Sequence, residues 1–338
     1  MFNYPKKVNI ADITIRDGFQ HEERIIPLDA KVWMAEQLVL AGFKHLEIGT
    51  YGNSKIVPQF NDIDELFKRV RNSKRIKDKL DDVVLTVIAM REKPIERAIE
   101  AYKEGYGPDR ILMLSATSES YQKKSSNYSI KEYWRMAEKY VKKATDAGLK
   151  VNGAVTTIWG CPIEGPTNIN DAFSFARRWL DIGASDVEHA DHDGSASPNR
   201  VYDYFKRVID NFDNPIQHIA HFHSRRGFGA ANVLAALQAG VVNFEATFGG
   251  TGGQPANFID GVPIMGTGKY YISDKNITGL ICLEDLVVML DEMGIDTGLD
   301  VDKVLELGRM TEKIIGRRLR SEAIKSGRIP KKLSNKDY

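Results

Sequence analysis

His218-Ile219-Ala220-His221-Phe222-His223 overlaps a mainly apolar run, residues 216–222, whose composition predicts a β-strand. Successive strand side chains point to opposite faces, so His221 and His223 project from the same face, one above the other. Two imidazoles in this arrangement commonly begin a divalent-metal site, which needs one or two further ligands from elsewhere. The alternative is a pair of histidines that only fills a polar strand end, and the rest of the sequence bears on that choice.

This strand is the seventh of about eight β-rich runs that alternate with helical patterns. The predicted strands cover residues 8–15, 45–49, 83–89, 110–114, 150–156, 186–190, 216–222 and 242–246. Between them, apolar residues recur with helical spacing near residues 29–41, 61–71, 95–104, 130–147, 170–182, 199–212 and 228–239. Such repetition implies parallel strands joined by right-handed crossovers. Eight units within about 250 residues fit a closed (β/α)₈ barrel better than an open sheet.

The chain after the eighth strand departs from this repeat. Residues 249–253 are glycine-rich, and Gln254, a polar loop to about residue 278 and a helical pattern over 283–326 follow. We expect an α/β fold, a (β/α)₈ TIM barrel with a C-terminal helical extension. The expected domains are a catalytic barrel at 1–282, helices packed on it at 283–326 and a basic tail at 327–338. The glycine-rich stretch is too irregular and too late in the chain for a dinucleotide fingerprint.

Composition excludes several classes of function. The 338 residues include 47 basic and 46 acidic side chains, a net charge of +1, so we expect neither nucleic acid nor a membrane surface as a partner. The longest apolar run, residues 83–90, is far shorter than a membrane span, and residues 1–9 lack the apolar stretch of a secretory signal. The two cysteines, Cys161 and Cys282, imply no disulfide framework, and Cys161 is interpreted as a packing residue. We expect a cytoplasmic protein.

Polar side chains follow the predicted strands at the end where barrel enzymes carry their active sites. Arg16 and Asp17 follow strand one, and Glu47 lies in strand two. An aspartate with two imidazoles and water supplies the mixed oxygen and nitrogen ligands that suit Mg²⁺, Mn²⁺ or Zn²⁺. Arg16 beside such a cation is suited to stabilise an enolate or alkoxide oxygen; a structural salt bridge to Glu47 is the alternative, and both can hold at once.

The histidines are concentrated at two strand ends. Five of the seven fall at positions 189 and 192, after strand six, and at 218, 221 and 223 in strand seven. This clustering favours a metal site over a polar strand end.

The motif Ile15-Arg16-Asp17-Gly18-Phe19-Gln20, together with Glu47 and His221-Phe222-His223, resembles the signature of the DRE-TIM metallolyases. Within that superfamily the chain is most similar to the 3-hydroxy-3-methylglutaryl-CoA (HMG-CoA) lyases. The likeness extends over almost the whole chain and includes Val57-Pro58-Gln59, Gly160-Cys161-Pro162, Gly252-Gly253-Gln254-Pro255 and Glu284-Asp285-Leu286-Val287.

The resemblance implies that Asp17, His221 and His223 hold a divalent cation, Mg²⁺ or Mn²⁺ in the first place and Zn²⁺ as the alternative. The cation and Arg16 would bind carbonyl and hydroxyl oxygens of the substrate. A 3-hydroxyacyl-CoA would then be cleaved by a retro-Claisen reaction through a metal-stabilised enolate. Two acidic residues, Glu47 and Asp191, match positions of the family and would orient water, metal ligands or Arg16. We expect the substrate to be contacted by Gln20, Gln254 and Arg225, and the protein to form a homodimer or higher homo-oligomer.

Four features depart from the lyases. Gln254 occupies the position of their catalytic cysteine, and its amide cannot exchange a proton as a thiol can. Leu280 aligns with an asparagine metal ligand and cannot bind a metal. Residues 257–275 form an insertion, and Arg225-Arg226 after the histidine pair could face an acidic substrate, CoA phosphates or solvent. We therefore expect little activity on HMG-CoA itself and a different CoA ester or hydroxy acid as the substrate.

Two alternatives to this lyase function stay open at the level of sequence. One is a Claisen-type acyltransferase that condenses an acyl-CoA with a 2-oxo acid, because such synthases share the Arg-Asp-Gly and His-x-His motifs. The other is a catalytically silent barrel used as a binding subunit, which Gln254 and Leu280 would suit. The intact set of Arg16, Asp17, Glu47 and the two histidines speaks against a silent barrel, which has no need of it.

Overall fold

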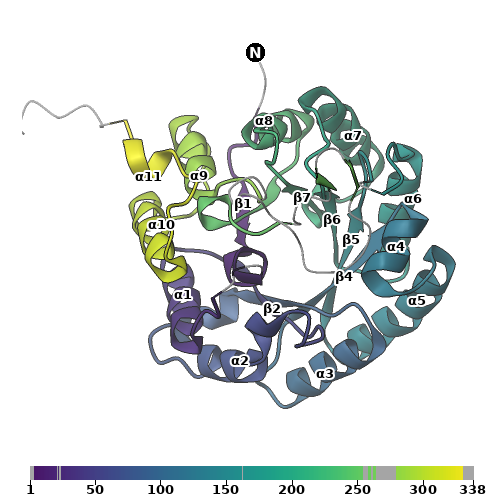
Figure 1. The fold of residues 1–338 in the computed structure, drawn as a ribbon, viewed down its shortest axis with the longest axis horizontal. Helices are drawn as coiled ribbons and strands as arrows, with labels where there is room; N and C mark the ends of the chain where they lie inside the picture. The colour runs from purple at the N-terminus through teal and green to yellow at the C-terminus, as the bar shows by residue number, and fades with distance from the viewer. Residues whose placement is uncertain are drawn as a thin grey trace, which may run out of the picture.

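The computed structural model describes residues 4–20, 22, 24–161, 163–253 and 279–329, and the backbone of 258–259 and 262–263. Eight parallel strands close into a barrel in the order β1 to β8, with helices around it (Figure 1). The expected TIM-barrel fold is confirmed. The strands are β1 (Asn9–Asp12), β2 (His45–Thr50), β3 (Val84–Ile88), β4 (Arg110–Ala116), β5 (Lys150–Thr156), β6 (Asp186–Asp191), β7 (His218–Phe222) and β8 (Asn243–Ala246).

The helices between the strands match the predicted patterns, with one addition. They are α1 (Leu28–Leu40), α2 (Ile63–Arg71), α3 (Glu92–Lys103), α4 (Glu119–Ser126), α5 (Ile130–Asp146), α6 (Ile169–Asp181), α7 (Pro198–Asn211) and α8 (Gly229–Ala239). The addition is α4, which lies beyond the carboxyl end of β4. Its sequence is largely polar and carries no apolar stripe, so helical periodicity did not reveal it. The Ser118 side chain caps its first turn by accepting the amide of Tyr121 at 3.2 Å.

The first strand is shorter than the predicted run of residues 8–15. It ends at Asp12, whose carboxylate accepts the Thr14 amide at 3.0 Å and the Thr14 hydroxyl at 2.7 Å. This local bonding competes with strand pairing and turns the chain into a short π-helix, Thr14–Gly18. Arg16 and Asp17 therefore lie in a tight turn over the barrel mouth and not at the end of an extended strand.

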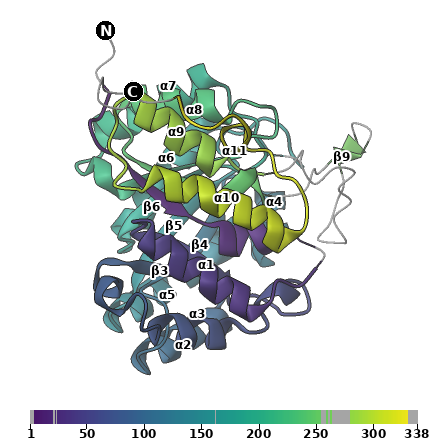
Figure 2. The same ribbon diagram turned by 90° about the vertical axis from the view of Figure 1, so that its left-hand side faces the viewer.

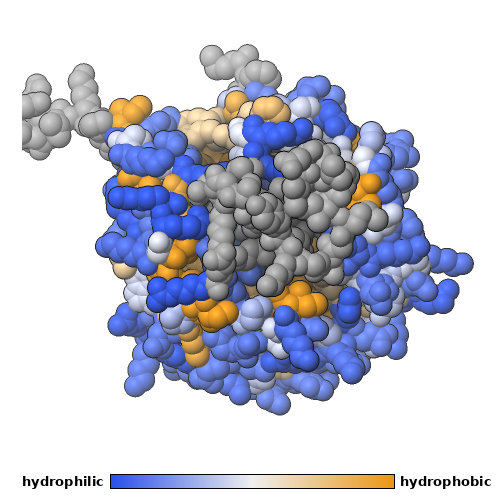
Figure 3. Space-filling view, in the orientation of Figure 1, coloured by the Kyte–Doolittle hydropathy of each residue, from blue (hydrophilic) through white to orange (hydrophobic). Residues whose placement is uncertain are grey.

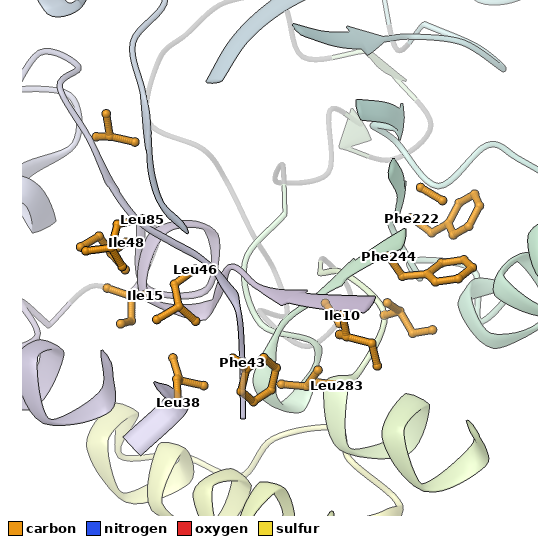
Figure 4. Close-up of a cluster of buried hydrophobic side chains, with 14 of the residues drawn as sticks. Ile10, Ile15, Leu38, Phe43, Leu46, Ile48, Leu85, Phe222, Phe244 and Leu283 are labelled. Atoms are coloured by element: carbon orange, nitrogen blue, oxygen red, sulfur yellow. The ribbon is translucent and has the colours of Figure 1, made fainter. Parts of the chain in front are cut away.

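Apolar side chains fill the layer between the strands and the surrounding helices. Figure 4 shows Leu38 of α1, Leu46 of β2, Phe244 of β8 and Leu283 of α9 as members of one cluster of buried side chains. All four are at most 1% exposed, so one core joins the amino-terminal, central and C-terminal parts of the chain.

Within the described residues after the barrel strands, three helices follow: α9 (Leu283–Glu292), α10 (Val301–Ile315) and α11 (Ala323–Ser326). Figures 1 and 2 show α10 running beside α1. The Asp300 amide donates to the Ala41 carbonyl at 3.0 Å, and the Asp296 amide donates to the Lys6 carbonyl at 2.9 Å. These bonds tie the loop between α9 and α10 to the amino-terminal part of the barrel.

The surface that faces the viewer in Figure 3 is mainly hydrophilic around its rim. Within the described residues, no helix combines the length and the apolar character that a membrane span requires.

Candidate active site

Asp17, His221 and His223 come together at the mouth of the barrel. The carboxylate extends from the π-helical turn after β1, His221 lies in β7 and His223 directly follows that strand. All three side chains are buried, and one ligand atom from each lies within 4.8 Å of the others. The Nε2 atoms of the two histidines are 3.1 Å apart. The structure therefore brings the predicted ligand set together.

Two glutamates for which the sequence predicts no role contact the Nδ1 atom of His221. Its Nδ1 lies 2.9 Å from Oε2 of Glu245 and 3.3 Å from Oε1 of Glu188. Strand register explains this, because His221 pairs with Ala190 of β6 and with Glu245 of β8. A carboxylate on Nδ1 fixes the ring orientation and leaves Nε2 available as a ligand atom.

Glu188, His221 and Glu245 form a second cluster that could hold a metal ion. Since the two glutamates occupy the nitrogen opposite the one that faces His223, we interpret them as supporting groups of the first cluster. Burial, reinforced by Glu245, raises the pKa of Glu188 to about 8. The Glu245 position carried a usable signal: a charged residue in a barrel strand with apolar Phe244 and Ala246 on either side.

Asp17 is fixed by contacts from three residues. Oδ2 accepts Arg16 Nη1 at 2.8 Å, and Oδ1 accepts Gln20 Nε2 at 3.0 Å and the Gly253 amide at 2.6 Å. Burial alone would raise its pKa, but Arg16 and the two histidines outweigh this and lower the pKa of Asp17 to about 2. Asp17 is therefore an ionised carboxylate, as a metal ligand must be.

The glycine-rich loop packs directly on this aspartate. Gly252 has a φ of +78°, and a Cβ there would lie 2.3 Å from the Asp17 carbonyl oxygen. Neither the backbone conformation nor the space admits a side chain. The glycine at this position is thus a requirement of the site.

Arg16 forms the salt bridge with Glu47 that the sequence suggested, through its Nε, and contacts Asp17 through Nη1. The guanidinium is buried between the two carboxylates. Burial raises the pKa of Glu47 to about 7, although Arg16 opposes the shift. The salt bridge holds the guanidinium at the barrel mouth, next to a ligand of the candidate metal site.

Two other predicted residues lie at the rim. Oδ1 of Asp191 accepts the amides of Ser195 and Ala196 at 2.8 and 3.2 Å, and burial raises its pKa to about 7. Asp191 thus shapes the loop after β6. Arg225 is half-buried after β7, whereas its neighbour Arg226 donates to the Gly194 carbonyl at 2.7 Å.

Two of the departures from the lyase pattern, Gln254 and Leu280, have different outcomes. Gln254 lies outside the described residues, as does most of the insertion at 257–275. Leu280 is fully buried and forms an isolated antiparallel bridge with His223. An aliphatic side chain thus sits beside the second histidine, where the resemblance places an amide ligand.

Two further side chains at this mouth, His192 and Tyr121, were not assigned from sequence. His192 directly follows β6, and its ring lies 5.6 Å from that of His223, centroid to centroid. The Tyr121 hydroxyl is hydrogen-bonded to His192 Nε2. The clustering of histidines pointed to position 192, but nothing in the sequence pointed to a tyrosine in a polar helix.

The donor set fits a divalent cation. An ionised carboxylate and two imidazole nitrogens converge in a buried position, and Nδ1 of His221 is already bonded to carboxylates. Three protein ligands of this kind leave coordination positions for water or substrate, as in catalytic sites.

Comparisons with known proteins identify relatives that match almost the whole chain. The family model HMGL-like matches residues 7–311. The mitochondrial hydroxymethylglutaryl-CoA lyase of Bos taurus is 29% identical over 94% of this chain and 89% of its own length. The hydroxymethylglutaryl-CoA lyase of Bacillus subtilis is 27% identical over 94% of this chain and 96% of its own. A solved HMG-CoA lyase of Acinetobacter baumannii superimposes with a TM-score of 0.82 at 28% identity, over 97% of both chains. The chain therefore belongs to the HMGL-like family and is an HMG-CoA lyase-like enzyme.

Proposed function

We propose that this protein is a divalent-metal-dependent carbon–carbon lyase that cleaves a 3-hydroxyacyl-CoA. The observation that carries the proposal is the convergence of Asp17, His221 and His223 beside the Arg16–Glu47 pair. These three residues would hold the cation, Mg²⁺ or Mn²⁺ in the first place. When bound, such a cation acts as a Lewis acid toward oxygen atoms of the substrate.

Arg16 supplies fixed positive charge for the reaction. In a retro-Claisen cleavage a base takes the hydroxyl proton, the C2–C3 bond breaks as a carbonyl forms at C3, and negative charge develops on the thioester oxygen of the enolate. A guanidinium already oriented by two carboxylates stabilises this charge without reorganising during the step. Water then returns a proton to C2. Glu47 and Asp191 orient Arg16 and the loop after β6.

The proposed substrate class rests on the relatives and on one arginine side chain at the rim. The Acinetobacter lyase was solved in complex with coenzyme A and 3-methylmalate. In this chain Arg226 is engaged by Gly194, so Arg225 is the better placed of the two arginines to meet a substrate anion. Together with Gln20 and Gln254 it forms the proposed substrate-contacting set. Because Gln254 replaces the thiol of the lyases, and the insertion at 257–275 and Arg225-Arg226 depart from them as well, we propose that the acyl group differs from that of HMG-CoA.

The test is a mass-spectrometric screen of acyl-CoA esters with the purified protein and Mn²⁺ or Mg²⁺. HMG-CoA is included, and acetoacetate and free thioester products are measured. Metal-dependent cleavage of another 3-hydroxyacyl-CoA, with little acetoacetate from HMG-CoA, is the expected result. Robust acetoacetate formation would show that HMG-CoA itself is a substrate, as it is for the other lyases of the family. Net condensation with a 2-oxo acid would identify an acyltransferase, and no turnover with any ester would favour a binding subunit.

Two broader expectations belong to the same proposal. The relatives include a mitochondrial bovine lyase and a cytoplasmic mouse lyase, and we assign this chain to the cytoplasm. We also propose a homodimer or higher homo-oligomer, which sedimentation equilibrium of the purified protein tests.

A further inference from the structure

The two histidines of the proposed metal site are supported in different ways. Glu245 and Glu188 hold the Nδ1 atom of His221. Among the side chains that the structure describes, no carboxylate forms a hydrogen bond with His223. Since a metal-binding imidazole needs a fixed orientation, some other group has to hold this ring.

Two imidazole rings lie close to the ring of His223. Its centroid lies 5.1 Å from that of His221, with 43° between the ring planes, and 5.6 Å from that of His192, with 35° between them. The backbone amide of His223 donates to the Asp191 carbonyl at 3.3 Å, and the backbone of His223 forms an isolated antiparallel bridge with Leu280. The His192 ring therefore lies next to the His223 ring.

Tyr121 in turn fixes His192. The phenol hydroxyl is hydrogen-bonded to Nε2 of His192, and the two rings meet edge to face with centroids 4.6 Å apart. Both side chains are at most 8% exposed. Tyr121 lies in the first turn of α4, which is capped by Ser118 and lies near β4 in Figure 1. A continuous set of contacts thus runs from α4 through Tyr121 and His192 to His223.

We propose that Tyr121 and His192 are positioning residues that orient His223 for the cation. The inference rests on the proposed metal site. The resemblance places an asparagine ligand where this chain has Leu280, and we infer that Tyr121 and His192 support the site in its place. A leucine there can neither bind a metal nor form a side-chain hydrogen bond. The hydroxyl of Tyr121 fixes the His192 ring, and the His192 ring packs against the His223 ring.

The test compares two tyrosine substitutions in the full-length protein. Tyr121→Phe removes the hydroxyl and keeps the ring. Tyr204→Phe is the matched control, because Tyr204 is buried in α7 and bonds another histidine, His189, at 2.8 Å with no contact to the ligand set. Mn²⁺ affinity is measured by calorimetry, the visible absorption of bound Co²⁺ reports ligand geometry, and thermal unfolding in EDTA reports stability without metal.

Loss of an outer-shell partner typically weakens metal binding about 10- to 100-fold. We expect Tyr121→Phe to weaken Mn²⁺ binding at least about tenfold and to shift the Co²⁺ bands, and Tyr204→Phe to change neither. His192→Gln, which loses the ring, should weaken binding further and serves as a second variant should Tyr121→Phe fail to fold.

An Mn²⁺ affinity within about twofold of the parent in folded Tyr121→Phe would overturn the inference. An equal loss in Tyr204→Phe would also overturn it, since it would show an effect of general packing. Absence of Mn²⁺ and Co²⁺ binding by the unaltered protein would instead refute the metal site itself, and the inference with it.

Discussion

Arg16 contributes both a positive charge and the fixed geometry of its guanidinium. Its fork contacts Glu47 through Nε and Asp17 through Nη1, a geometry that a single ammonium cannot reproduce. Arg16→Lys keeps the charge but loses the second contact. We expect the turnover number to fall about 100- to 1,000-fold with little change in thermal stability. Steady-state kinetics on the substrate found by the ester screen measure this. Near-normal turnover by the lysine variant would show that Arg16 is structural.

Metal binding can be separated from folding at a single histidine. His221→Ala removes a ligand atom from the barrel mouth, so metal stoichiometry should fall from one ion per chain to zero while the far-ultraviolet circular dichroism is retained. His218→Ala is the matched control: it lies three residues earlier in the same strand and bonds His189 at 2.9 Å, away from the ligand set. Inductively coupled plasma mass spectrometry after dialysis measures bound metal. Full occupancy in His221→Ala would exclude this site.

At the scale of elements, α9 is joined to the glycine-rich loop by a buried carboxylate. Glu284, in the first turn of α9, accepts the Gly249 amide at 2.8 Å and the Cys282 thiol at 3.0 Å. Gly308 of α10 packs against the same carboxylate, and Asp12 and Asp285 are the charged groups nearby. Burial raises the pKa of Glu284 to about 7 from an ordinary 4.5.

This shift has a defined sign for stability. Because the folded state holds the proton more tightly than the unfolded state, the Glu284 contribution is complete below pH 4.5 and is lost as the pH rises to about 7. The loss amounts to about 3 kcal/mol at most. Glu284→Gln cannot ionise, so its unfolding free energy relative to the parent should increase between pH 5 and pH 8. Urea unfolding of both proteins at the two pH values measures the difference, and a constant difference would contradict the shifted pKa.

Elements were predicted with unequal success, and the reason is physical. Strands and amphipathic helices leave a periodic pattern of apolar residues in the sequence, so β5 and α5 agree with the predicted runs to within one residue. The end of β1 and the whole of α4 are decided by polar side-chain bonding, through Asp12 with Thr14 and through the Ser118 cap. Such local bonds leave no periodic trace in the sequence.

The candidate site, too, could be predicted only in part, because some of its contacts are local in sequence and others are not. Residues adjacent in sequence, such as His221 and His223, could be paired from strand geometry alone. The support of His221 by Glu245 depends on β7–β8 register, and the contact of Tyr121 with His192 joins residues 71 positions apart. Neither is visible without the closed barrel.

At the scale of the whole molecule, the predicted boundary at residue 282 can be tested as a question of cooperativity. Leu283, Leu286, Val287 and Leu290 of α9 are at most 1% exposed and belong to the same core as the barrel strands. Arg317 reaches back to Glu22 at 2.5 Å, close to the turn that carries Asp17. We propose that residues 283–326 are a separate segment of sequence but part of one folding unit with the barrel.

Truncation after Cys282 should therefore unfold the barrel itself. The chain keeps its four tryptophans, Trp33, Trp134, Trp159 and Trp179, all of which precede the cut, so their emission reports the barrel alone. The truncation removes four buried aliphatic side chains and exposes the barrel surface that they cover. Burial of one such side chain contributes about 1.5–3 kcal/mol, so the summed loss is comparable to the total stability of a typical domain. We expect red-shifted emission and loss of cooperative melting in the truncated chain. Truncation after Ile329, which removes only residues 330–338, should retain both. Native emission and a sharp melting transition in the shorter chain would establish 1–282 as an independent domain.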